Sequence, residues 1–121
     1  MVDLDLGPYV QDQIKQADTI QKQIESLLSQ QYQYELKSRE DRKTLEYLKD
    51  AKPDDEIYRT VGSILVRVRD VEGFKKELEE DVEISEMRLK TIKEQISQLD
   101  SKLKTITEEI NKIYKKAEQK S

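Results

Sequence analysis

Two long stretches of the sequence carry apolar residues at alternating spacings of three and four, the pattern of a coiled-coil helix. The second stretch is the more regular, because its pattern runs without a slip for about five heptads. Its seam, meaning the positions that face a partner helix, consists of Leu78, Val82, Ser85, Leu89, Ile92, Ile96, Leu99, Leu103, Ile106, Ile110, Ile113 and Ala117. We therefore expect a helix over residues 73–119, beginning at Gly73.

The first stretch predicts a helix over residues 8–50, with Pro8 in its first turn, where a missing N–H is no loss. Its apolar seam begins Val10, Ile14, Ala17, Ile20, Ile24, Leu27. The step of three from Ala17 to Ile20 follows another step of three, which is a local stammer in the heptad order. Further along, the seam falls on Gln31, Tyr34, Ser38, Asp41, Leu45 and Leu48. We expect the middle of this helix to pair weakly, because its seam there is polar.

A β-hairpin is predicted between the two helices, over residues 56–69. Two runs rich in β-branched residues, 57–61 and 64–68, are separated only by Gly62-Ser63. A two-residue loop with Gly first fits a type II′ turn. Since the helices are similar in length, we expect them to fold back antiparallel. The sequence thus predicts a mainly α fold, in which a long antiparallel two-helix coiled coil is joined by one β-hairpin in a single unit over residues 1–121.

The hairpin needs a partner to be stable, because an isolated two-stranded hairpin is marginal in water. The two helices are occupied with each other, so we expect no local core to receive its apolar face. Its strand edges are also unpaired and invite further strands. We expect hairpins from several chains to join into a β-barrel hub from which the helices project as arms. The predicted oligomer interface is Ile57, Tyr58, Val61, Gly62, Ile64, Leu65, Val66 and Val68.

The amino-acid composition excludes several classes of function. The chain has 40% charged and 35% hydrophobic residues and contains no Cys, His or Trp. Thiolate and imidazole metal sites, and Cys or His nucleophiles, are therefore excluded, and we expect neither catalysis nor a cofactor. The net charge of −4 gives no electrostatic attraction to nucleic acid or to an anionic membrane. No apolar run approaches the roughly 18 residues of a membrane span. We expect a soluble, cytoplasmic protein.

Apolar residues gather where the two helices end away from the hairpin. Exposed apolar side chains amid charge are suited to binding another apolar polypeptide. The predicted set, called the helix-end set below, is Leu4, Leu6, Val10, Ile14, Ile106, Ile110, Ile113 and Tyr114. An ordinary frayed coiled-coil end is the alternative interpretation of the same residues.

The segment Asp-Asp-Glu-Ile-Tyr-Arg-Thr-Val-Gly-Ser-Ile-Leu-Val, residues 54–66, resembles the hairpin of archaeal prefoldins. The single hairpin is similar to that of the β-class subunit, and the resemblance extends over both helices. It implies a hetero-hexamer with α-class prefoldin subunits and other copies of itself. That complex would hold unfolded client proteins at the ends of its arms, without ATP, and pass them to a group II chaperonin.

Two questions stay open at this point. A coiled-coil scaffold or tether that is not a chaperone would share the helices and the hairpin, but would bind one folded partner. The basic end of the second helix, with Lys112, Lys115 and Lys116, complements the helix dipole. A chaperonin-docking contact is the sharper interpretation of these lysines.

Overall fold

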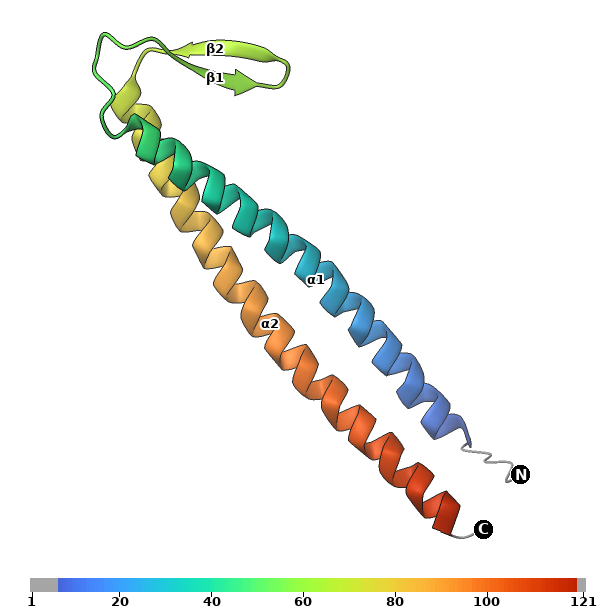
Figure 1. Cartoon of the computed structure of the whole chain (residues 1–121). Helices are drawn as coiled ribbons and strands as arrows, with labels where there is room; N and C mark the ends of the chain where they lie inside the picture. The colour runs from blue at the N-terminus through green and yellow to red at the C-terminus, as the bar shows by residue number, and fades with distance from the viewer. Residues whose placement is uncertain (1–6, 120–121) are drawn as a thin grey trace. The chain divides into compact units, whose positions relative to one another are not determined.

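The computed structural model describes residues 7–119. Along the chain lie helix α1 (Gly7–Leu48), strand β1 (Ile57–Val61), strand β2 (Ile64–Val68) and helix α2 (Val71–Gln119) (Figure 1). These bounds fall within one or two residues of those expected from the sequence. The mainly α fold, two long antiparallel helices joined by a β-hairpin, is confirmed.

Two compact units make up the chain. The first unit combines the part of α1 up to Gln31 with the part of α2 from Thr91 onward. The second unit, Tyr32–Lys90, holds the rest of both helices together with the hairpin.

In the first unit α1 and α2 pack through alternating apolar positions. Val10 and Ile20 of α1 are buried, as are Ile92 and Ile106 of α2. The hydroxyl of Tyr9 also donates a hydrogen bond to the carboxylate of Glu109, at 3.3 Å. Contact between the start of one helix and the end of the other is what an antiparallel pair requires. All the α2 seam positions predicted from the sequence are at least half-buried.

The start of α1 corrects the expected stammer. Ile14 is 47% exposed, whereas Gln13 is half-buried. With Gln13 in the seam, the sequence of packed positions runs without a break from Val10 through Ala17 to Ile20. The heptad is therefore regular here, and an amide takes a place where an apolar residue was expected. The backbone keeps its period, so the one-residue offset of Ile14 turns that side chain outward.

A small core in the second unit corrects the expectation that the chain has no local core for its hairpin. Leu48, Val68, Phe74 and Leu78 are buried together, with Leu45, Ala51, Ile57 and Val71 packed around them. The physical reason lies at the start of α2, which begins at Val71, before Gly73. This extra half turn adds Val71 to the residues that pack around the core, beside Phe74 and the base of the hairpin.

Asp70 explains why α2 begins early. Its carboxylate accepts a hydrogen bond from the backbone N–H of Gly73, at 3.0 Å. That is an N-cap, which satisfies a donor that the helix itself leaves unpaired. A Cβ at position 73 would collide with the Asp70 carboxylate, so Gly73 leaves room for the cap and lies inside the helix instead of beginning it.

Polar residues occupy part of the seam in the second unit, as the sequence predicts. Ser38, Asp41 and Ser85 are buried. Lys37 donates to Asp41 at 3.0 Å, and an ion pair joins Arg42 of α1 to Glu86 of α2. The Arg88 guanidinium lies over the Tyr34 ring, 5.8 Å from its centroid. An ion pair and a cation–π contact thus join the helices where apolar contact is thin.

Candidate functional site: the hairpin and the helix groove

The register of the hairpin decides which side chains share a face. The strands are antiparallel, with Ile57 opposite Val68 and Val61 opposite Ile64. Gly62, first in the loop, has a φ of 61°, and no described non-glycine residue has a positive φ. This is the backbone of a type II′ turn, in which the first loop residue alone is left-handed. Side chains then alternate between two faces along each strand.

One face of the hairpin is apolar except for Arg59. We call Ile57 and Val68 its base, and Val61, Ile64 and Val66 its tip. The base belongs to the core of the second unit, with Val68 only 9% exposed. The tip is uncovered: Val66, Val61 and Ile64 are 40%, 51% and 60% exposed. Five apolar residues on one face therefore have two different environments.

The opposite face of the hairpin is also partly apolar. Tyr58 is 51% exposed and Leu65 is 71% exposed, and they alternate with Thr60 and Arg67. Of the predicted interface, Tyr58, Leu65 and the tip are free to meet another chain, while the base is held by this one. Whether these residues form an oligomer interface stays a prediction.

Arg59 divides the base from the tip and ties the hairpin to α2. Its two guanidinium nitrogens donate to both carboxylate oxygens of Glu77, at 3.0 and 3.3 Å. The same group lies over the Phe74 ring, 4.7 Å from the centroid. The hydrogen bond from Arg59 lowers the pKa of Glu77, and the bond to Glu77 raises the pKa of Arg59. This arrangement was not anticipated from the sequence, because the two hydrogen bonds join residues on different elements, Arg59 on β1 and Glu77 on α2.

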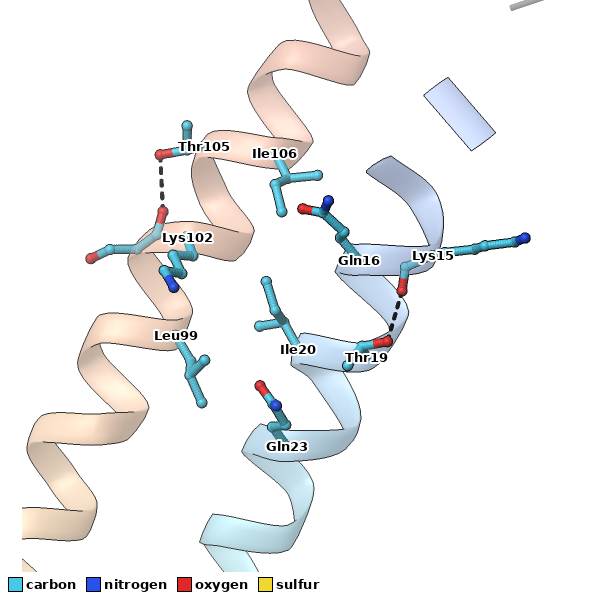
Figure 2. A pocket seen from close by; sticks show the side chains of 10 residues that line it. Lys15, Gln16, Thr19, Ile20, Gln23, Leu99, Lys102, Thr105 and Ile106 are labelled. Carbon is cyan, nitrogen blue, oxygen red and sulfur yellow. Dashed lines mark hydrogen bonds between the residues drawn. The ribbon is translucent and has the colours of Figure 1, made fainter. Parts of the chain in front are cut away.

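A groove runs between the helices of the first unit and measures about 710 Å³. Figure 2 shows Ile20, Leu99 and Ile106 pointing into the space between α1 and α2. Polar side chains complete the lining: Lys15, Gln16, Thr19, Gln23, Ser101, Lys102 and Thr105. A second groove of about 440 Å³ shares Gln23, Leu99 and Lys102 with it and reaches Leu27. An apolar floor with a polar rim suits an apolar side chain of a polypeptide.

The helix-end set is mostly seam in the structure. Val10 and Ile106 are buried, and Ile110, Ile113 and Tyr114 are half-buried. Ile14 is the exposed member, and Leu4 and Leu6 lie outside the described residues. Ile106 lines the groove together with Ile20 and Leu99, two predicted seam residues outside the helix-end set. Client binding by this set stays a prediction.

Comparison with known proteins decides the family. The sequence pattern described as "Prefoldin subunit" matches residues 11–117, most of the chain. The chain belongs to the prefoldin family. It is 41% identical over 93 residues to the prefoldin subunit beta of Thermoplasma acidophilum, covering 77% of this chain and 75% of that one. To the Pyrococcus horikoshii subunit beta it is 32% identical over 87 residues, covering 72% and 74%.

A solved structure agrees with the sequence relatives. The crystal structure of the prefoldin beta subunit from Thermococcus strain KS-1 superposes with a TM-score of 0.76 at 29% identity, covering 89% of this chain and 94% of that one. The chain is thus a beta-type subunit with archaeal relatives, and its role lies in the prefoldin chaperone complex. Prefoldin subunits are a non-enzymatic chaperone family. Among residues 7–119, neither helix has an apolar stretch long enough to cross a bilayer.

Proposed function

We propose that this prefoldin subunit is part of an ATP-independent holdase. Its hairpin assembles with α-class subunits and with other copies of itself into a hexamer that works in the cytoplasm. The helix ends and the groove of the first unit then hold unfolded polypeptide until a group II chaperonin receives it.

The observation that supports the assembly step best is the uneven burial of the hairpin. Its base is fixed in the core of the second unit, but its tip leaves Val61, Ile64 and Val66 at least 40% exposed. Burying apolar surface gains about 25 cal/mol per Å². A strand pair with a buried base and an uncovered apolar tip is therefore suited to meet the hairpins of other subunits.

Client capture is supported by the groove of the first unit and by Ile14. The apolar floor of the groove accepts an apolar side chain, and the glutamines and lysines around it set no strict sequence requirement. Each chain offers only a small site of this kind. Several arms acting on one client would supply the missing affinity by avidity.

Two measurements test the proposal in order. Light scattering after size exclusion, on the full chain with and without an α-class subunit, should show a hexamer mass only when both are present. The assembled complex should then slow the aggregation of a denatured client diluted into buffer without nucleotide. A complex that forms but leaves aggregation unchanged would favour a scaffold or tether, and a chain that ignores the α-class subunit would contradict the assembly step.

A further inference from the structure

The one charged residue on the apolar face of the hairpin is held in a specific place. Arg59 lies between the buried base and the exposed tip, on the face that also carries Val61 and Val66. An unpaired guanidinium at this position would be costly to bury when another chain covers the tip. Here both of its terminal nitrogens are paired with Glu77.

The contacts of Arg59 reach the first turns of α2 from two directions. The Arg59 guanidinium lies over the Phe74 ring, and its two terminal nitrogens donate to the two carboxylate oxygens of Glu77. Phe74 and Glu77 are neighbours on one side of a helix, since they are three positions apart in the sequence. A planar, forked contact of this kind fixes direction as well as distance, which a single lysine–carboxylate pair does not.

Among the described residues, the hairpin is otherwise attached through its base and through the two residues, Arg69 and Asp70, that join β2 to α2. Its base contributes only Ile57 and Val68 to the core of the second unit, and apolar contacts are non-directional. A hairpin held by its base alone would swivel, and each assembly step would then carry the entropy of stopping that motion.

We propose that Arg59 is a positioning residue for assembly: clasped by Glu77 and Phe74, it fixes the hairpin on α2 and carries its charge, neutralised, into the subunit interface. This inference rests on the proposed function, because it assumes assembly through the hairpin. It extends the interface beyond the strands to Glu77, a helix residue.

The direction of the hairpin is measurable, because the chain has no native cysteine. Spin labels attached through Ser63→Cys in the turn and Glu80→Cys on the exposed side of α2 report the distance between hairpin and helix. We expect one narrow distance distribution for the otherwise unchanged chain. Arg59→Gln and Glu77→Gln should each broaden it, and Arg59→Glu combined with Glu77→Arg should narrow it again in part. Arg67→Gln, on the opposite face, is the matched control and should change nothing.

Assembly with an α-class subunit is the second readout. Arg59→Gln removes both the ion pair and the cation–π contact and should raise the concentration needed for half-assembly about three- to tenfold. Glu77→Gln removes only the ion pair and should raise that concentration about two- to fivefold. The reversed pair should recover part of that loss, and Arg67→Gln should match the unchanged chain. Circular dichroism of each variant confirms that the helices are folded.

The outcomes separate this inference from the proposed function. If the unchanged chain does not assemble, the proposed function fails. If the unchanged chain assembles and Glu77→Gln assembles equally well, with the same distance distribution, then the role of the Arg59–Glu77 pair in positioning the hairpin is overturned. An effect of Arg59→Gln alone, without one of Glu77→Gln, would make Arg59 a direct contact and would also overturn it.

Discussion

Glu77 is the α2 carboxylate that pairs with Arg59 of the hairpin. The hydrogen bond and charge of Arg59 lower its pKa, so the folded state favours the carboxylate. Its contribution to stability is therefore present above the ordinary glutamate pKa and is lost as the pH falls through the lowered value. NMR titration of the Glu77 carboxyl should give a pKa below that of the same group in Arg59→Gln. Equal values in the two proteins would contradict the pairing.

Gln13 is a position at which an apolar substitution should stabilise the chain. It occupies a half-buried seam position in the first unit, flanked by Val10 and Ala17. Gln13→Leu should stabilise the helix pair by about 1 kcal/mol through added apolar burial. That raises the midpoint of thermal unfolding by about 3–5 °C, measured by circular dichroism. Ile14→Gln, one residue on and exposed, is the control and should leave the midpoint nearly unchanged; the reverse ranking would place the seam at Ile14.

At the scale of elements, the two ends of the hairpin should respond differently to the same truncation. Val68→Ala removes a buried side chain from the core of the second unit and should cost about 1–3 kcal/mol of stability. Val66→Ala, on the same strand and face but 40% exposed, should change stability by less than about 0.5 kcal/mol. Chemical denaturation measures both.

Assembly should rank the same two variants in the opposite order. Val66→Ala removes surface from the exposed tip and should weaken the complex with an α-class subunit, seen as a higher half-assembly concentration. Val68→Ala should assemble normally at temperatures where it is folded. A Val66→Ala chain with undiminished assembly would show that the tip is not an interface.

The elements themselves were predictable, because each rests on a local pattern. The three–four spacing gave both helices, and Gly62-Ser63 between two β-rich runs gave the hairpin and its turn type. What escaped was set by tertiary contact or by capping. Asp70 starts α2 early and so adds Val71 to the core at the hairpin base, although an Asp before a helical run is a recognisable cap signal. Because Ile14 is apolar, the apolar pattern places it in the seam, whereas the period alone favours Gln13.

At the scale of the whole molecule, the proposed site could be predicted only in outline. Sequence reasoning placed a hub at the hairpin and client contact at the helix ends. Most of the helix-end set also lies in the predicted seams, and its described members other than Ile14 are packed within the first unit. The sequence alone leaves open how the two helices pair, because packing in an antiparallel pair depends on which positions of the other helix lie opposite. The groove beside Ile20 and Leu99 is a product of that pairing. Client capture is therefore better tested through exposed Ile14 than through buried Val10.

Client capture should fall more steeply than in proportion to the number of intact arms in the complex. Under the proposed function, the described part of each chain offers only a small apolar area to a client, so holding a client needs several arms at once. Complexes are assembled from mixtures of unchanged chains and Ile14→Gln chains, and suppression of aggregation of a denatured client is measured at each ratio. We expect suppression to fall faster than the fraction of unchanged chains. Lys104→Gln, on α2 outside the groove lining, should have no effect at any ratio. A straight-line decline would mean that each arm holds client independently, against the avidity on which the proposed holdase depends.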